Sequence, residues 1–254
     1  MSQKRIDLIM NIIKEQGYVT VKYLCDELHY STATINRDLN DLQNKKLIVR
    51  HYGGAELAAK KGTPLVFRYH KMRPVKRVIA KKAAELIKDG MTVFIDGTTT
   101  TQYMGQYIKP YKNLTIITNN LNLASHLSEQ GIACICLGGR INEPPYMIGG
   151  PDAAAHARSY TADIAFFSTN SITDDGKILC GDAYFDLHKA MINNSTKTVF
   201  LADHEKINNP ASRVLCTLSD IDVIMTDYMF SEDTKATYPN TDFVEVKTPK
   251  TQER

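Results

Sequence analysis

The hydrophobic residues at the start of the chain recur at the spacing of α-helices. Isoleucines repeat at this period over residues 2–16, and a second apolar stripe after Gly17 predicts another short helix. A third stripe predicts a helix over residues 31–44, with a tight turn before it. The residues of the three stripes are Ile6, Ile9, Ile12 and Ile13, then Val21, Leu24 and Leu28, then Ile35, Leu39 and Leu42.

The pattern changes to short strands after the third helix. Residues 46–50 resemble a strand, residues 52–54 a turn, and residues 55–57 the returning strand. Gly53 and Gly54 allow positive φ angles and a close approach of the backbone to another surface. Two helices joined by a tight turn and followed by a hairpin form a winged helix-turn-helix, which places its second helix in the major groove of double-stranded DNA. We therefore predict a small DNA-binding domain over residues 1–58.

The third helix is polar on the side opposite its apolar stripe. Arginine pairs with guanine, asparagine with adenine, and alanine can contact a thymine methyl group. Ser31 is a good N-cap, which brings the first turn close to a phosphate. The predicted DNA contacts are Ser31, Thr32, Ala33, Asn36, Arg37, Asn40, Arg50 and His51. Asp38 cannot face phosphate, so we expect it to point sideways, toward Arg5 or Arg37. An ordinary solvated amphipathic helix is the alternative, and the basic hairpin that follows argues against it.

Helices alternate with strands from residue 75 onward. The predicted strands are residues 91–95, 114–117, 132–137, 163–167, 198–201 and 223–226, and the predicted helices are residues 75–87, 100–108, 121–129 and 183–193. This alternation predicts an α/β domain with a parallel-core sheet and right-handed crossovers. The expected organisation is a DNA-binding domain over residues 1–58, a linker over 59–74 and a sensor domain over 75–254.

Polar loops follow five of the predicted strands. They begin at Asp96, Thr118, Gly138, Ser168 and Ala202. The carboxyl ends of parallel strands form the crevice in which such sheets bind ligands. The first loop, a run of threonines that leads into a helix, suits an anionic group such as phosphate. A threonine-rich turn can also cap a helix without any ligand, but five loops at one edge favour a binding site.

Composition changes this picture only in detail. The chain has 254 residues and a net charge of +3, and nine lysines and arginines with no acid lie between Glu56 and Glu85. Such a run is consistent with a solvated linker or with a contact to the DNA backbone. The five cysteines show no metal-ligand spacing, so we expect reduced thiols, no metal site and no cofactor. No segment resembles a membrane span or a signal peptide, so we expect a cytoplasmic protein with no membrane partner.

Over nearly its full length the chain resembles the DeoR family of bacterial transcriptional repressors. The segments that carry the resemblance are residues 34–39, 50–55, 96–99, 118–119, 137–139 and 201–203. The resemblance implies a winged helix-turn-helix joined to a sensor domain shaped like sugar-phosphate isomerases. It also implies repression of a sugar-catabolism operon and release from operator DNA when a phosphorylated sugar binds.

The resemblance implies that the effector pocket is lined by Asp96, Gly97, Thr98, Thr99 and Asn119, with charge contributed by Lys189, Asp203 and Lys206. The loops after the strands add Thr100, Gly138, Gly139 and Ser168 to the expected site. The lysines would contribute charge toward a phosphate. The chain departs from the family pattern at Asn36, where arginine is common, and at Ser168, Ser171, Phe185 and Glu205. These departures point to an effector that differs from those of the better-known members.

Two other functions remain open from the sequence. An active phosphosugar isomerase would need a carboxylate base, for which Asp96, Asp163, Asp182 and Asp203 are the candidates. The absence of an acid at Phe185 argues against turnover, so we expect no enzyme. A transcriptional activator, with a non-sugar input, is the second alternative. Whether the protein is a repressor or an activator, we expect it to form a homodimer or a homotetramer.

Overall fold

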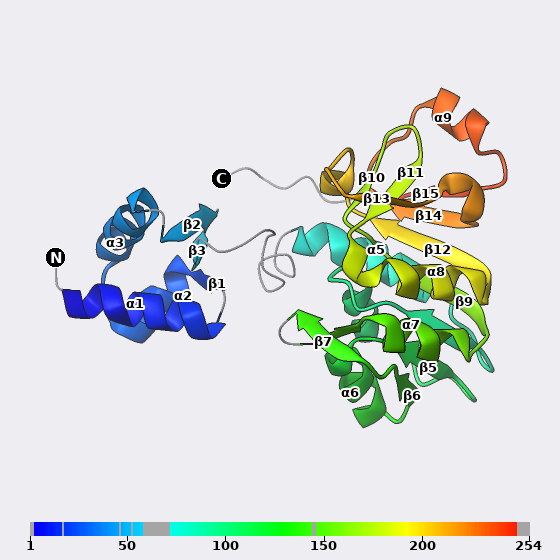
Figure 1. Ribbon diagram of the computed structural model, residues 1–254, viewed down its shortest axis with the longest axis horizontal. Helices are drawn as coiled ribbons and strands as arrows, with labels where there is room; N and C mark the ends of the chain where they lie inside the picture. The colour runs from blue at the N-terminus through cyan, green and yellow to red at the C-terminus, as the bar shows by residue number, and fades with distance from the viewer. Residues whose placement is uncertain are drawn as a thin grey trace. The chain divides into compact units, whose positions relative to one another are not determined.

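The computed structural model describes residues 3–16, 18–45, 47–51, 53–57, 72–143 and 146–247. The chain divides into two compact units, Met1–Lys71 and Met72–Arg254 (Figure 1). Most of the linker predicted over residues 59–74 lies outside the described residues. Among the described residues, no helix is both long enough and apolar enough to cross a membrane.

The N-terminal unit contains three helices and a three-stranded antiparallel sheet. The helices are α1 (Gln3–Gln16), α2 (Val21–Leu28) and α3 (Thr32–Asn44). The strands are β1 (Tyr18–Thr20), β2 (Ile48–His51) and β3 (Gly54–Leu57), in the order β1-β3-β2. The predicted helices and the β2–β3 hairpin are confirmed. Strand β1 was not predicted, because three residues between two helices carry no usable alternation.

The three apolar stripes meet in one core. Ile9, Leu24, Ile35 and Leu39 have no exposed surface, and Ile6, Ile13 and Leu42 are also buried with them. Gly54 lies where β3 passes β1, and a Cβ atom there would collide with the Tyr18 ring and the Val19 carbonyl. Its glycine is therefore required by a close approach between strands, whereas Gly53 has the positive φ of +82° that the turn needs.

A seven-stranded parallel sheet is the centre of the C-terminal unit. Its order is β15-β14-β12-β9-β4-β5-β6, and every neighbouring pair is parallel. The strands are β4 (Thr92–Ile95), β5 (Thr115–Thr118), β6 (Ala133–Cys136), β9 (Ala162–Phe167), β12 (Ser195–Ala202), β14 (Val223–Thr226) and β15 (Asp242–Glu245). The six predicted strands and their parallel arrangement are confirmed. The chain reverses its direction of progress through the sheet between β4 and β9, which makes this pair the topological switch point.

Helices cover both faces of this sheet. On one face α7 (Pro151–Arg158) packs against α8 (Phe185–Asn193), and both bury apolar side chains against β4, β5 and β9 (Figure 1). The 3-10 helix η1 (Thr101–Gln106) and the helix α6 (Leu121–Glu129) belong to the crossovers from β4 to β5 and from β5 to β6, whereas α5 (Arg73–Ala84) precedes β4 and contacts β12 and β14. The helix expected over residues 100–108 is thus a short 3-10 helix. Its threonines and Gly105 favour α-helix poorly, and the Thr101 hydroxyl is directed back at Asp96 instead.

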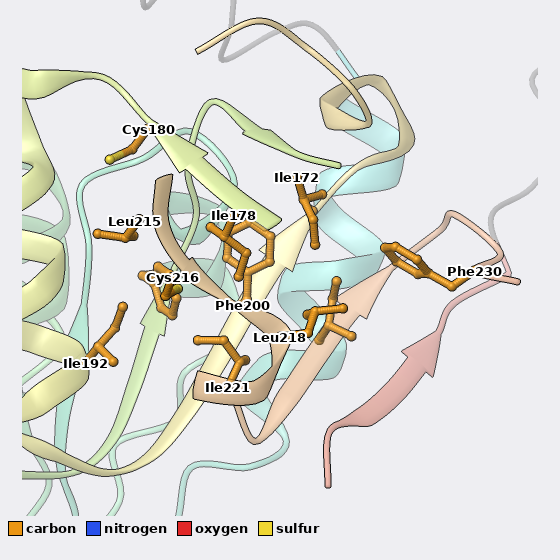
Figure 2. Packing of buried hydrophobic residues seen from close by; sticks show 13 residues of the cluster. Ile172, Ile178, Cys180, Ile192, Phe200, Leu215, Cys216, Leu218, Ile221 and Phe230 are labelled. Carbon is orange, nitrogen blue, oxygen red and sulfur yellow. The ribbon is translucent and has the colours of Figure 1, made fainter. Parts of the chain in front are cut away.

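A second, antiparallel sheet of three strands was not predicted. It contains β10 (Ser171–Ile172), β11 (Lys177–Cys180) and β13 (Arg213–Thr217), in that order. Its apolar side chains pack with Phe200 and with residues of β14 and α8 in one cluster (Figure 2). The remaining described elements are the hairpin β7 (Arg140–Glu143) and β8 (Met147–Gly149), the 3-10 helices η2 (Asp182–Tyr184), η3 (His204–Lys206) and η4 (Leu218–Asp220), and α9 (Glu232–Thr237). These elements are too short for their periodicity to be read from the sequence.

Candidate DNA-binding surface and effector site

The third helix, α3, presents the predicted polar surface. Ser31 caps the helix, because its hydroxyl accepts a hydrogen bond from the Thr34 amide at 3.3 Å. Thr32, Ala33, Arg37 and Asn40 are exposed. The Arg37 guanidinium makes no hydrogen bond or ion pair to any part of the chain that the structure describes. It is therefore available to another molecule.

Asp38 is the one acid of α3 that lies in the core of the unit, with no exposed surface. Its two carboxylate oxygens accept hydrogen bonds from Arg5 Nε at 2.5 Å and Nη2 at 3.0 Å. The Arg5 guanidinium also lies over the Tyr30 ring, 4.8 Å from its centre. Of the two arginines predicted as partners of Asp38, the structure selects Arg5, which anchors α1 to α3 and leaves Arg37 on the surface.

Arg50 reaches from the wing to α3. Its Nη1 donates to the Asn40 side-chain oxygen at 2.5 Å, and its Nη2 donates to the Asn36 side-chain oxygen at 2.5 Å. The neighbouring His51 ring lies 3.0 Å from a Glu56 carboxylate oxygen on β3. The structure therefore brings Asn36, Asn40 and Arg50 together as a polar group, while His51 turns toward the sheet.

Asp96 organises the loops at the carboxyl edge of the parallel sheet. It is fully buried, and one carboxylate oxygen accepts hydrogen bonds from the Thr98 hydroxyl at 2.8 Å and the Thr101 hydroxyl at 2.5 Å. The other oxygen accepts from the Ser168 amide and from His188 Nε2, both at 3.0 Å. These bonds tie the loop after β4 to the loop after β9, across the topological switch point. Asp96 thus shapes the site with a carboxylate that is fully engaged by protein donors.

His188 was not predicted as a site residue. It lies on α8, is 4% exposed, and its Nδ1 atom has no hydrogen-bond partner among the described residues. The rings of Phe167 and Tyr184 flank it. A histidine within the apolar stripe of a helix is an ordinary core residue in most proteins, so the sequence carried no signal for its contact with Asp96.

Lys76 is the second site residue that the sequence analysis missed. It lies in the first turn of α5 and is 4% exposed, and its ammonium group donates to the Thr99 hydroxyl at 3.1 Å. Lys76 belongs to the basic run that we interpreted as linker or DNA contact. Lys76 lies three residues after Arg73, the first residue of α5, and nothing in the sequence distinguished it from the other lysines and arginines of this run. The fold places it, with a buried positive charge, against the threonine loop.

Gly97 and Asn119 bring the first two loops into contact. A Cβ atom at Gly97 would lie 3.0 Å from Met147 and 3.3 Å from the Asn119 amide group. Asn119 donates to the Ile148 carbonyl at 2.7 Å, which ties the loop after β5 to β8. Gly139 follows β6 with a φ of +141°, and a Cβ atom there would lie 2.9 Å from the Gly149 carbonyl. The adjacent Gly138 is exposed, and its amide donates to His156.

The remaining predicted effector residues lie around the same edge, except for Lys189. Asp203 is buried at the end of β12, and Lys206 Nζ donates to the Thr169 carbonyl at 2.5 Å. Lys189 is half-buried on α8 and is near Cys180 and Cys216, where its charge acts to lower the thiol pKa. Burial dominates, however, and raises the pKa of Cys216 to about 12. The structure therefore puts His188, rather than Lys189, against Asp96.

The four sensor-unit residues that depart from the family pattern differ in how deeply they are buried and in what they contact. Ser168 and Ser171 are fully buried, and the Ser168 hydroxyl donates to the Leu201 carbonyl at 2.5 Å. Phe185 packs against the cluster of the second sheet, with the Arg213 guanidinium 3.5 Å from its ring centre. Glu205 is half-buried in η3. Ser168 and Ser171 are therefore enclosed by the fold, whereas Phe185 and Glu205 are only partly buried.

Several buried polar atoms of the sensor unit have no hydrogen-bond partner within the described ranges. They are Thr100 Oγ1, Asn119 Oδ1, Ser171 Oγ and His188 Nδ1. Buried polar atoms are nearly always paired, since an unmet one costs about 1–3 kcal/mol. All four residues lie in or beside the loops that Asp96 and Asn119 connect. Among the described residues, no group of three or more histidines, cysteines or acids is arranged to hold a metal ion.

The carboxylates considered as catalytic bases have other roles in the structure. Asp163 accepts a hydrogen bond from the Thr92 amide at 2.7 Å at the start of the sheet, away from its carboxyl edge. Asp182 is mostly exposed and lies 3.6 Å from Arg213. Asp96 is surrounded by donors, as described above. Asp203 is buried at the carboxyl end of β12.

Comparisons with known proteins identify both units. The DeoR-like helix-turn-helix domain matches residues 5–61, and the DeoR C terminal sensor domain matches residues 72–228. Among solved structures, ribose 5 phosphate isomerase A from Neisseria gonorrhoeae is similar over 52% of each chain, with 14% identity and a TM-score of 0.38.

Two curated relatives cover most of the chain. The glycerol-3-phosphate regulon repressor of Escherichia coli (strain K12) is 33% identical over 226 residues, which are 86% of this chain and 88% of that protein. The HTH-type transcriptional repressor GlcR of Bacillus subtilis (strain 168) is 29% identical over 228 residues, 89% of this chain and 88% of that protein. The chain therefore belongs to the DeoR family of transcriptional repressors.

Proposed function

We propose that this protein represses a sugar-catabolism operon by binding operator DNA through α3 and the wing. A phosphorylated sugar at the carboxyl edge of the sensor sheet releases it from the DNA. The protein acts in the cytoplasm as a homodimer or homotetramer, and it is a regulator rather than an enzyme. The observation that carries the proposal is the buried Lys76 ammonium against the Thr99 hydroxyl, at the threonine loop.

The DNA side of the proposal rests on α3. Its exposed face carries Arg37 and Asn40, and both side chains can reach base edges in a major groove. Ser31 and Thr32 lie at the helix N-terminus, where amide groups and hydroxyls bind phosphate. Arg50 adds a positive charge from the wing beside that face. These positions fit a helix that enters the groove by its N-terminal half.

The phosphate side rests on charge and on hydrogen-bond donors. Lys76 supplies a positive charge that is shielded from solvent, where an ionic contact is stronger than at the surface. The Thr99 hydroxyl accepts from Lys76 and can donate its own proton to a phosphate oxygen, and Thr98 lies beside it in the same loop. The loop leads into η1, whose first amide groups point toward its N-terminal end. This combination suits a dianionic phosphate monoester. Glycerol 3-phosphate, after which the Escherichia coli relative is named, is a compound of this class.

The rest of the ligand would carry hydroxyl groups. Thr100 Oγ1, Asn119 Oδ1 and His188 Nδ1 are buried polar atoms without partners among the described residues, and hydroxyls can satisfy all three. His188 Nε2 is directed at Asp96, which leaves Nδ1 for a hydroxyl group of the ligand. A phosphorylated polyol or sugar matches such a site better than a phosphate alone.

Release from DNA requires that the effector discriminate between two arrangements of the protein. A ligand that binds both arrangements equally changes nothing, so the sugar phosphate must bind the DNA-incompetent one more tightly. Lys76 lies four residues after Met72, where the second unit begins. A contact between phosphate and Lys76 would therefore act at the N-terminal end of the sensor unit.

A thermal-shift screen of the purified full chain tests the effector. The panel contains glycerol 3-phosphate and hexose and pentose phosphates, each beside its unphosphorylated counterpart. A ligand at 100 times its dissociation constant stabilises the folded state by about 2.7 kcal/mol, which raises the unfolding midpoint measurably. We expect a hit among the phosphorylated compounds only, and the same compound should dissociate the protein from operator DNA.

Two variants make the screen specific. Lys76→Met should lose the stabilisation by the phosphorylated compound, whereas Lys81→Met, an exposed lysine on the same helix, should retain it. Stabilisation by an unphosphorylated sugar, or an undiminished response of Lys76→Met, would contradict the phosphate assignment. Turnover of ribose 5-phosphate by the purified protein would instead support the isomerase alternative.

A further inference from the structure

The contacts of Arg50 within the chain indicate which part of its guanidinium group is available to DNA. A guanidinium group has five N–H donors and no acceptor. Arg50 Nη2 donates to the Asn36 side-chain oxygen, and Nη1 donates to the Asn40 side-chain oxygen. Nη1 also lies 3.5 Å from the Asn36 backbone carbonyl. The end of the guanidinium that carries both η nitrogens is therefore directed at α3.

The donors that remain on Arg50 share one edge. Nε and Nη2 lie side by side on this edge, because Nη2 is the nitrogen on the same side of the guanidinium as the Nε proton, and Nη2 has a second N–H group besides the one that meets Asn36. Arg50 has no other hydrogen bond or ion pair to the described residues. Two parallel donors of this kind match two oxygens of one phosphate. Arg50 can thus bind a phosphate without giving up its contacts with α3.

Asn36 is held at both ends of its amide. Its oxygen accepts from Arg50, and its nitrogen donates to the Thr32 carbonyl at 2.9 Å. The bidentate pairing of asparagine with adenine uses the oxygen and the nitrogen together. Asn36 is also half-buried, whereas Arg37 and Asn40 are exposed. These contacts leave Asn36 poorly suited to reading a base.

We propose that Asn36 is a positioning residue: together with Asn40 it holds Arg50 on the recognition helix, so that Arg50 binds one DNA phosphate through its Nε and Nη2 edge. Arg37 then reads bases, and Asn40, whose oxygen faces Arg50, reads them with its amide nitrogen as a donor. The side chain at position 36 must be an acceptor, which an arginine could not be. This proposal rests on the proposed binding of operator DNA.

The test compares the full-length wild type with Asn36→Ala, Arg50→Ala and the double variant. Each protein selects duplexes from a randomised pool, and each is then titrated with the best wild-type duplex and with a scrambled duplex at several salt concentrations. Asn36→Ala should weaken binding to both duplexes by about fivefold, the factor that corresponds to one hydrogen bond of typical net strength. It should leave the selected base preference unchanged.

Arg50→Ala should reduce the slope of log K against log salt by about one for each bound recognition helix, as expected for the loss of a phosphate contact. The double variant should bind like Arg50→Ala alone, because Asn36 acts through Arg50. Asn44→Ala is the matched control: this exposed asparagine of α3 makes no hydrogen bond to Arg50, and its loss should change neither affinity nor preference. Unfolding midpoints establish that each variant is folded.

Two results would overturn the assignment of Asn36 while leaving operator binding intact. One is a relaxed preference at a single base pair in the duplexes selected by Asn36→Ala, which would make Asn36 a base reader. The other is additivity of the Asn36→Ala and Arg50→Ala effects, since independent contacts add and a supporting contact does not. A wild-type protein that enriches no sequence from the pool would overturn both this inference and the proposed function.

Discussion

His188 Nε2 lies 3.0 Å from a carboxylate oxygen of Asp96, although 92 residues separate the two in the chain. Both side chains are buried, and the contact connects α8 to the loop after β4 at the switch point of the parallel sheet. A carboxylate in such a position is tolerated only when its oxygens are met by donors. The Asp96–His188 contact is therefore part of what holds the candidate effector site in shape.

Replacing His188 tests this role. His188→Ala should lower the free energy of unfolding by about 1–3 kcal/mol, because it removes one donor from a buried carboxylate. His188→Gln, which retains an N–H donor at similar reach, should be destabilised less. Chemical denaturation of the two variants measures the difference. Equal destabilisation by the two substitutions would mean that packing, rather than the hydrogen bond, is what His188 contributes.

The threonine loop should be needed for the effector response but not for DNA binding. The double variant Thr98→Ala with Thr99→Ala removes the hydroxyls that contact Asp96 and Lys76. We expect it to bind operator DNA with wild-type affinity and to remain bound when the effector is added. DNA binding measured with and without the effector identified in the screen checks this. An unaltered response would move the effector site elsewhere.

Arg37 should dominate recognition of the operator. Its exposed guanidinium has no partner within the described parts of the chain, so Arg37→Ala should leave the fold intact. Specific binding should weaken by roughly 1–3 kcal/mol, and selectivity at one base pair should relax. Titration with operator and scrambled duplexes measures the effect: loss of a base contact weakens binding to the operator only, whereas loss of charge weakens binding to both duplexes. Unchanged affinity for operator would show that α3 is not the recognition helix.

Gly139 should tolerate no side chain. Its φ of +141° is unfavourable for any L-residue, and a Cβ atom would also press on the Gly149 carbonyl and Ala153. Gly139→Ala should therefore cost about 1–3 kcal/mol of stability from the backbone alone, with the steric contact in addition. Gly131→Ala is the matched control, because Gly131 has a φ of +79° and open space at its Cβ position. Similar losses for both variants would mean that the close approach at Gly139 relaxes easily.

The thiols of the sensor unit should resist alkylation while the protein is folded. Burial raises the pKa of Cys134 and Cys180 to about 11 and that of Cys216 to about 12. Only the thiolate reacts, so at pH 8 about one thiol in a thousand at Cys134 or Cys180 is reactive at any moment. Iodoacetamide labelling, followed by mass spectrometry, should modify these three cysteines slowly until denaturant is added. Rapid labelling in the native state would contradict the raised pKa values of these thiols.

Parts of the fold could be predicted because they are encoded by local patterns. The stripes of α1, α2 and α3 follow the helical period, and six of the seven strands of the parallel sheet are continuous apolar runs next to glycine or polar turns. Strand β15 and the three strands of the second sheet were missed. These strands are short. The side chains that bury the second sheet include Phe200 of β12 and Ile224 of β14, which belong to other elements of the chain.

The amino-acid sequence by itself determined the two-part organisation, the polar face of α3 and the edge of the sheet where polar loops gather. Each of these follows from the spacing of neighbouring residues. Tertiary structure alone decided that Lys76 contacts Thr99, that His188 rather than Lys189 meets Asp96, and that Asn36 holds Arg50. Such pairs join separate elements, and whether two polar side chains meet depends on how their backbones pack, which no local period contains.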